Sequence, residues 1–168
     1  MVKCIAFDCF GTVFDMSTVS REEISDYVQH VKKADFSPYA FSDAWFDLKA
    51  HPDSAEGIRR LQSDGYKCVT LSNGGWGMLG GISAINGIIW DHITDLIEHR
   101  AYKPNNLDAY RAIEKDLGFF PSQTLMVTAN PTFGDIKGAA AIGMPSQVIR
   151  HGYPNTIIEL AEMLNSKV

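Results

Sequence analysis

The sequence predicts an α/β fold, in which a parallel sheet of five short strands carries helices on both faces. Two observations predict it: five short apolar runs bounded by turn residues, and segments of helical periodicity that alternate with them along most of the chain. Such alternation is typical of parallel sheets, because parallel neighbours are joined by a helix that packs on the sheet. The 168 residues, 45% of them hydrophobic and 21% charged, are enough for one globular domain.

The predicted strands end in polar or glycine-containing turns. The first covers residues 2–7 and is followed at once by the loop 8–12, which contains a glycine. The others are expected at residues 66–71, 93–97, 124–128 and 146–149. Ligands of parallel α/β sheets bind at the carboxyl ends of the strands, so the residues that follow each run are the candidates for chemistry.

The predicted helices begin and end at recognisable capping residues. Ser20 and Glu23 form a capping-box pattern at the start of a helix that ends near Ala34. The apolar residues of that helix recur at helical spacing and are Ile24, Tyr27, Val28 and Val31. Pro52 begins a second helix and Gly65 ends it. The remaining helices are expected at residues 106–117, 134–142 and 155–164.

Residues 16–50 interrupt the alternation between the first strand and the helix that leads to the second. We therefore expect a core of residues 1–15 and 51–168, and a small helical insertion of residues 16–50 over the strand ends. The insertion contains the aromatic residues Phe36, Tyr39, Phe41, Trp45 and Phe46. We expect them to pack inside the chain, and a homodimer interface remains the alternative.

Charge and composition exclude several classes of partner. Fifteen Lys and Arg against twenty Asp and Glu give a formal net charge of −5, without the concentrated basic face that nucleic acid binding requires. No run approaches the roughly 18 apolar residues of a membrane span, and no secretory leader pattern opens the chain, so we expect a cytoplasmic protein. Cys4, Cys9 and Cys68 are widely spaced in apolar surroundings, so we expect core thiols, not disulfides or a metal site.

A carboxylate directly follows the first predicted strand. Gly11 and Thr12 let the backbone turn tightly around Asp8, and a carboxylate held against backbone amides stays ionised and can act as a nucleophile. An isolated aspartate after a strand more often caps a turn. The prediction of a nucleophile therefore depends on the polar residues that follow the other strands.

The second and third strands are also followed by polar residues. Ser72 and Asn73 supply a hydroxyl and an amide, which can hold an anion or a carbonyl group. Lys103 follows the third strand after a short connection. A lysine beside a nucleophilic carboxylate keeps it ionised and neutralises charge on the substrate, although a lysine taken alone is most often a surface residue.

Thr128, Asn130 and Asp135 follow the fourth strand and add a second carboxylate. Asp135 is placed to pair with Lys103 or to orient a water molecule. The alternative is that Asp135 caps the helix that begins at residue 134, since a negative charge stabilises a helix N-terminus.

Taken in order, these four motifs resemble those of the haloacid dehalogenase superfamily of hydrolases. The similar segments are IAFDCFGTVFD at 5–15, VTLSNG at 69–74, AYKP at 101–104 and VTANPTFGDIKGAAAIG at 127–143. The resemblance covers nearly the whole chain. It implies a Rossmann-like parallel sheet with helices on both faces and a small helical cap insertion.

Two positions distinguish the branches of that superfamily. Its phosphatases carry a second aspartate where this chain has Phe10, and a Gly-Asp pair where it has Thr128 and Ala129. Phenylalanine cannot transfer a proton, and the missing carboxylate weakens a magnesium site. The chain is more similar to the type II 2-haloacid dehalogenases, which have an aromatic residue at the position of Phe10, and Ser or Thr followed by Asn at the fourth strand.

The resemblance implies a catalytic role for four residues. Asp8 would displace halide from C2 of a small 2-haloacid and form an ester, which water would hydrolyse to a 2-hydroxy acid without a metal or organic cofactor. Thr12 would support the loop of the nucleophile, and Lys103 would stabilise the nucleophile. Asp135, with Asn130 and Thr128, would position the hydrolytic water. The residues implied to contact the substrate are Phe10, Ser72, Asn73, Thr128 and Asn130.

The chain departs from the family pattern in the insertion and in two spacings. Residues 16–50 are shorter than the family's cap, which supplies a halide-binding arginine, and Arg21 is the only arginine in that segment. Extra residues precede Tyr110 and Asp135, which would move both side chains from their expected places. Two alternatives therefore stay open: a Mg²⁺-dependent phosphatase of the same superfamily with Asp8 and Asp135 as metal ligands, and a catalytically silent binding protein that keeps the fold.

Overall fold

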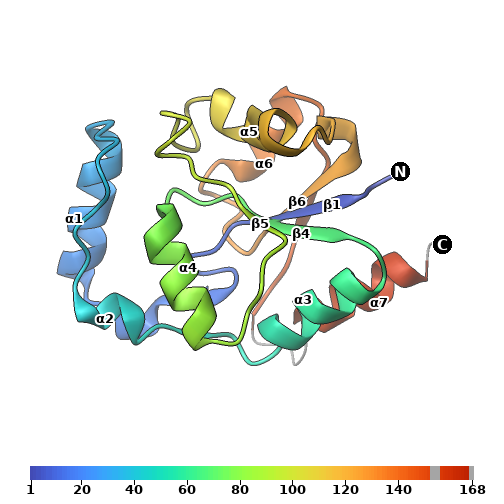
Figure 1. Cartoon of the computed structure of the whole chain (residues 1–168), viewed down its shortest axis with the longest axis horizontal. Coiled ribbons are helices and arrows are strands. Elements are labelled where there is room, and N and C mark those ends of the chain that lie inside the picture. Colours follow the sequence, from blue (N-terminus) through green and yellow to red (C-terminus); the bar gives the residue numbers. More distant parts are fainter. Residues whose placement is uncertain (152–155, 167–168) are drawn as a thin grey trace.

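The computed structural model describes residues 1–151 and 156–166, and its main sheet has five strands, all paired in parallel (Figure 1). Their order across the sheet is β5-β4-β1-β6-β7. The strands are β1 (Cys4–Phe7), β4 (Lys67–Thr70), β5 (His92–Ile93), β6 (Thr124–Thr128) and β7 (Ser146–Val148). The predicted α/β fold is confirmed.

Helices cover both faces of the sheet (Figure 1). On one face lie α3 (Ser54–Ser63), α4 (Trp76–Ile85) and α7 (Thr156–Asn165); on the other lie α5 (Asp108–Leu117) and α6 (Asp135–Ala141).

The central strand explains this layering. Successive strand residues point to opposite faces, so Ile5 and Phe7 of β1 join the core under α3, α4 and α7. Cys4 and Ala6 join the core under α5 and α6. All four side chains are fully buried. The sequence of a strand that is covered on both faces is a continuous apolar run, which is why β1 could be predicted.

Residues 16–50 lie beyond the carboxyl ends of the strands, where α1 stands beside the sheet (Figure 1). Within them are α1 (Arg21–Lys32) and α2 (Asp43–Phe46). The Ser20 hydroxyl accepts a hydrogen bond from the Glu23 amide at 3.2 Å, so the predicted N-terminal cap of α1 is confirmed. Trp45 is 1% exposed in the core, and the ring of Phe36 stacks on Tyr102 at 4.8 Å.

Both ends of the insertion are joined by a short antiparallel pair. β2 (Phe14–Asp15) pairs with β3 (Lys49–Ala50), with Phe14 opposite Ala50 and Asp15 opposite Lys49. The chain therefore leaves the core and returns to it at one place. Neither of these two-residue strands was predicted, because so short a segment carries no measurable alternation.

Two further predictions need correction. The third strand, expected at 93–97, is limited to His92–Ile93, because the Thr94 amide donates to the Thr70 hydroxyl at 3.1 Å and a turn follows. α4 was not predicted, since Gly77, Gly80 and Gly81 lower its helix propensity. It forms because it buries three apolar side chains, Met78, Leu79 and Ile82.

The remaining predictions concern the termini, the cysteines and the membrane. The predicted start of the last helix at Asn155 lies outside the described residues; from Thr156 onward the helix is present. Cys4, Cys9 and Cys68 are buried and unpaired, as predicted. Among the helices of residues 1–151 and 156–166, none is long and apolar enough to cross a membrane.

Candidate active site

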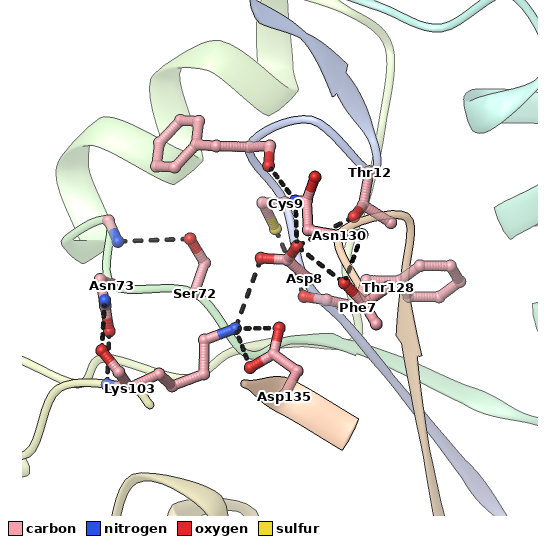
Figure 2. Close-up of polar contacts among 12 residues, drawn as sticks. Phe7, Asp8, Cys9, Thr12, Ser72, Asn73, Lys103, Thr128, Asn130 and Asp135 are labelled. Carbon is pink, nitrogen blue, oxygen red and sulfur yellow. Dashed lines mark hydrogen bonds and ion pairs between the residues drawn. The ribbon is translucent and has the colours of Figure 1, made fainter. Parts of the chain in front are cut away.

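Asp8 lies at the centre of the site, immediately after β1, and its two carboxylate oxygens have different surroundings (Figure 2). Oδ2 accepts three hydrogen bonds, from Thr12 Oγ1 at 3.0 Å, Thr128 Oγ1 at 3.2 Å and Asn130 Nδ2 at 2.9 Å. Oδ1 has one contact in the described part of the chain, with Lys103 Nζ at 3.4 Å. One oxygen is therefore fixed, and the other is left available for reaction.

The direction of the threonine hydrogen bonds follows from their second contacts. Thr12 Oγ1 accepts from the Ala129 amide at 2.9 Å, and Thr128 Oγ1 accepts from the Asn130 amide at 3.0 Å. Because each hydroxyl already accepts from an amide, its own hydrogen is directed at Asp8. Both threonines therefore donate to the carboxylate and stabilise negative charge on Oδ2.

The loop after Asp8 is shaped by a glycine in a left-handed conformation. Gly11 has φ +86°, and a Cβ at this position would lie 3.2 Å from Asn130 Nδ2. The amides of Thr12 and Val13 donate to the Cys9 carbonyl at 3.2 and 2.9 Å, which closes the turn. Glycine thus supplies both the backbone conformation and the room that Asn130 needs to reach Asp8.

Lys103 is buried between two carboxylates (Figure 2). Its Nζ lies 3.0 Å from Oδ1 and 3.1 Å from Oδ2 of Asp135, and 3.4 Å from Oδ1 of Asp8. With 3% exposure it is not the solvated surface lysine that its residue type alone favours. Burial by itself lowers the pKa of Lys103, but the charges of Asp8 and Asp135 outweigh it and raise that pKa above the ordinary value.

Asp135 is the first residue of α6 and is fully buried. Burial raises the pKa of its carboxyl group above the ordinary aspartate value, although the charge of Lys103 and the hydrogen bonds from Tyr110 and Lys103 lower it. The Tyr110 hydroxyl donates to Oδ1 at 2.7 Å. The carboxylate is therefore turned toward Lys103 and Tyr110, and α6 has no side-chain cap at Gly134.

Contacts of the main chain around Lys103 hold the residue in this position. The Asn73 side chain makes two hydrogen bonds to the main chain of Lys103. Its Oδ1 accepts from the Lys103 amide at 2.8 Å, and its Nδ2 donates to the Lys103 carbonyl at 3.0 Å. The Lys103–Pro104 peptide bond is cis, and a Cβ at Gly134 would lie 2.8 Å from Pro104 Cβ. The Asn73 amide thus connects the end of β4 to the lysine loop.

A cavity of about 720 Å³ opens in front of Asp8, between the strand ends and α1. Its polar lining residues include Asp8, Ser72, Asn73, Lys103 and Asn130 at the strand ends, together with Lys32, Asn105 and Asn106. Ser72 is buried, and its Oγ accepts from the Gly74 amide at 3.3 Å. Phe10 also lines the cavity and contacts the rings of Tyr27 and Trp45 edge-on, at 5.8 and 5.4 Å. Arg21 is exposed and is not among the lining residues.

The donor set near Asp8 does not fit a divalent cation. Among the described residues no three His, Cys, Asp or Glu side chains gather in a group that could hold a metal ion. The two carboxylates, Asp8 and Asp135, already share the ammonium group of Lys103. A dication between them would face this positive charge, and the side chain of Phe10 supplies no oxygen ligand.

Among curated proteins, the chain is similar to haloacid dehalogenases, which are hydrolases; no protein-family model matches it. The haloacetate dehalogenase H-2 of Moraxella sp. is 29% identical over 109 residues, covering 64% of this chain and 47% of that protein. An (S)-2-haloacid dehalogenase of Xanthobacter autotrophicus is 25% identical over an alignment of 189 positions, covering 85% and 73%. One of Burkholderia cepacia is 31% identical over 116 residues, covering 66% and 48%. The chain thus spans about half the length of the first and third relatives.

Solved structures share the fold over almost the whole chain. The L-2-haloacid dehalogenase of X. autotrophicus with chloropropionic acid covalently bound has a TM-score of 0.74 at 22% identity, covering 99% of this chain and 83% of that chain. Another L-2-haloacid dehalogenase has a TM-score of 0.76 at 16% identity, covering 99% and 100%. The chain is thus similar in sequence to haloacid dehalogenases and shares the fold of the L-2-haloacid dehalogenases. Of the residues predicted from the sequence as catalytic or substrate-binding, all except Asp135 bond Asp8 or line the cavity in front of it, and Asp135 is joined to Asp8 through Lys103.

The extra residues in the chain displace the side chains of Tyr110 and Asp135 less than the sequence indicated. Despite the extra residues that precede them, Tyr110 and Asp135 contact each other and Asp135 reaches Lys103. Tyr110 was not among the predicted site residues. The signal that could have found it is its place on the apolar face of the predicted helix 106–117, from which it points toward α6. A Cβ at Gly138 of α6 would lie 2.3 Å from the Tyr110 ring, so the two helices pack closely there.

Proposed function

We propose that this chain is a 2-haloacid dehalogenase that works without a metal ion and uses Asp8 as its nucleophile. The observation that carries the proposal is the unequal bonding of the Asp8 oxygens: three donors hold Oδ2, and a single long contact reaches Oδ1. In the proposed reaction, Oδ1 attacks C2 of the acid from the side opposite the halogen. The new C–O bond forms as the carbon–halogen bond breaks, and the halide leaves with its electron pair.

The same geometry supports the second step. Once Oδ1 is esterified, Oδ2 becomes the carbonyl oxygen of the ester, and it carries the negative charge when water adds to the carboxyl carbon. Thr12, Thr128 and Asn130 already donate to that oxygen, so they stabilise the charge without reorganising. The contacts that fix Oδ2 before the reaction are therefore an oxyanion site after it.

Asp135 and Lys103 serve the proton transfers in this proposal. Water gives one proton to Asp135 as it attacks the carboxyl carbon. The bond between that carbon and Oδ1 then breaks, and the departing alkoxide oxygen takes the proton from Asp135 to become the 2-hydroxy acid. The second water proton leaves the re-formed Asp8 carboxyl group, so one proton is released overall. A raised pKa suits a general base, since proton transfer is most effective near the working pH. Lys103 keeps the excess negative charge of two neighbouring carboxylates neutralised.

We propose residues 16–50 as the cap and residues 1–15 and 51–168 as the catalytic core. The cap contributes the wall of the cavity opposite the strand ends. By excluding water from the space next to Asp8, it strengthens the electrostatic contacts there. The substrate is a small organic acid bound between the two. Ser72 and Asn130 offer polar groups to it at the cavity wall, next to the nucleophile.

An isotope experiment tests the ester directly. The protein is incubated in H₂¹⁸O with a substoichiometric amount of 2-chloropropanoate, and both the product and the peptide that contains Asp8 are examined by mass spectrometry. We expect ¹⁸O in Asp8 and unlabelled oxygen in the product hydroxyl, because that oxygen comes from Oδ1. Label in the hydroxyl with none in Asp8 would mean direct attack by water, and phosphate release from p-nitrophenyl phosphate with Mg²⁺ would favour the phosphatase alternative.

A further inference from the structure

We infer that the haloacid for which this cavity is built carries a large apolar group at C2, of about the size of a benzyl group. The inference rests on the proposed function and specifies its substrate class. It stands on the size of the cavity, the separation of its polar and apolar walls, and the residues of α1 that it leaves uncovered.

The cavity is larger than a small haloacid requires. Its volume of about 720 Å³ lies in the range of pockets that enclose ligands of drug size, roughly 300–1,000 Å³. A haloacid of two or three carbons held at Asp8 would leave most of this space to water. A benzyl group at C2 would extend the ligand away from Asp8 and occupy the space in front of α1.

The polar groups around Asp8 and the apolar residues of α1 lie on different walls of the cavity. Asp8, Ser72 and Lys103 belong to the wall at the strand ends, where the reacting carbon and the carboxylate must lie. The facing wall is one side of α1, with four lining residues at the spacing of an apolar helix face: Ile24, Tyr27, Val28 and Val31. Lys32, the last residue of α1, is the charged residue of this wall. An acid with an apolar group on the carbon that also bears the halogen matches both walls at once.

The apolar wall is partly exposed, mainly at Val28. Val28 is 39% exposed although it lines the cavity, and Phe133, another lining residue, is 43% exposed. Phe36 stacks on Tyr102, and both rings also line the cavity. Apolar and aromatic surface of this kind gains free energy when an apolar group displaces its water.

Turnover of two substrates tests the inference. We would measure chloride release from both enantiomers of 2-chloropropanoate and of 2-chloro-3-phenylpropanoate, which differ only in the group at C2. The expected kcat/KM is about 10- to 100-fold higher for the phenyl compound, since burying an apolar side chain of this size is worth such a factor. Equal or higher kcat/KM for 2-chloropropanoate would overturn the inference and leave the proposed dehalogenase function standing.

A matched pair of variants locates the effect on α1. Val28→Trp fills the cavity side of the helix and is expected to reduce the preference for the phenyl compound at least about tenfold. Gln29→Trp adds the same ring one residue later, at an exposed position outside the cavity lining, and is expected to leave the preference unchanged. An unchanged preference in Val28→Trp, or the same loss in both variants, would contradict the assignment.

Binding of compounds without halogen separates this inference from the proposed chemistry. The affinities of propanoate and 3-phenylpropanoate can be compared by titration calorimetry with the whole chain, and neither compound can react. We expect 3-phenylpropanoate to bind at least about tenfold more tightly. Equal affinities would overturn the inference whatever the turnover. Tighter binding without halide release from any haloacid would refute the dehalogenase function alone.

Discussion

The ammonium group of Lys103 lies closer to Asp135 than to Asp8, at 3.0 Å from Oδ1 of Asp135 and 3.4 Å from Oδ1 of Asp8. The lysine is therefore held mainly by the carboxylate that we propose as the base. Its contact with Asp8, the proposed nucleophile, is the longer of the two. The arrangement keeps two buried carboxylates close together without immobilising the oxygen that attacks.

Asp8→Asn is expected to lower halide release at least about a thousandfold while the fold is retained. An amide is a poor nucleophile of nearly the same shape, and its oxygen can keep the hydrogen bonds that Oδ2 accepts from Thr12, Thr128 and Asn130. Steady-state kinetics and circular dichroism check both parts. The control Asp108→Asn changes an exposed carboxylate at the start of α5 and should behave as the parent. Parental turnover in Asp8→Asn would exclude Asp8 as the nucleophile.

Lys103→Met is expected to lower the free energy of unfolding by about 3–5 kcal/mol, because it leaves buried carboxylates without their cation. The pKa of Lys103 is raised in the folded chain, so its contribution is complete below the ordinary lysine value of about 10.4 and is lost as the pH rises through the raised pKa. Urea unfolding at neutral and alkaline pH measures this.

Lys67→Met, at an exposed position of β4, is the control for Lys103→Met and should change the free energy of unfolding by no more than about 0.5 kcal/mol. Adding Asp135→Asn to Lys103→Met removes one of the unpaired charges and should restore part of the lost stability. If Lys103→Met were as stable as Lys67→Met, the buried ion pairs would carry no net stabilisation.

Tyr110→Phe is expected to move the acidic limb of the pH–rate profile to higher pH. The hydrogen bond from Tyr110 lowers the pKa of Asp135, so its loss adds to the effect of burial and raises that pKa further. A higher pH is then needed to ionise the base. Tyr66→Phe, placed before β4 at the opposite end of the sheet, should leave the profile unchanged. A shift of the limb to lower pH in Tyr110→Phe would contradict the role proposed for Asp135.

Halide release is expected to survive exhaustive treatment with EDTA, since the positive charge between Asp8 and Asp135 is supplied by Lys103. The measurement is the initial rate before dialysis against the chelator, after it, and after addition of Mg²⁺. A rate that falls on chelation and returns with magnesium would support the phosphatase-like alternative.

The sequence was informative wherever a buried strand ends in a polar residue. Asp8 follows β1, and Thr128 ends β6, the neighbour of β1 in the sheet. Parallel pairing brings such positions to the same edge, which is why residues far apart in the sequence could be assigned to one site. Lys103 was assigned by resemblance, because nothing in its local sequence distinguishes a buried lysine from an exposed one.

Other features depend on contacts that no local pattern records. α4 contains three glycines and forms because tertiary burial of its apolar residues outweighs its low propensity. The hydrogen bond between Tyr110 and Asp135 requires α5 and α6 to pack as closely as Gly138 allows. The sequence also predicted a small lobe over the strand ends without giving the volume enclosed beneath it, since that volume depends on where α1 stands.

The pairing of Phe14 with Ala50 joins the two ends of residues 16–50 like the base of a hairpin. A segment attached in this way can be lengthened, shortened or exchanged without moving the strands that hold Asp8 and Lys103. In the function that we propose, reaction and selectivity are thus encoded in separable stretches of the gene: the strand ends carry the bond-breaking chemistry, and the inserted stretch contributes to selecting the molecules that reach it. Transplanting a longer insertion between the same two short strands offers a direct route to altering selectivity while the reacting groups stay in place.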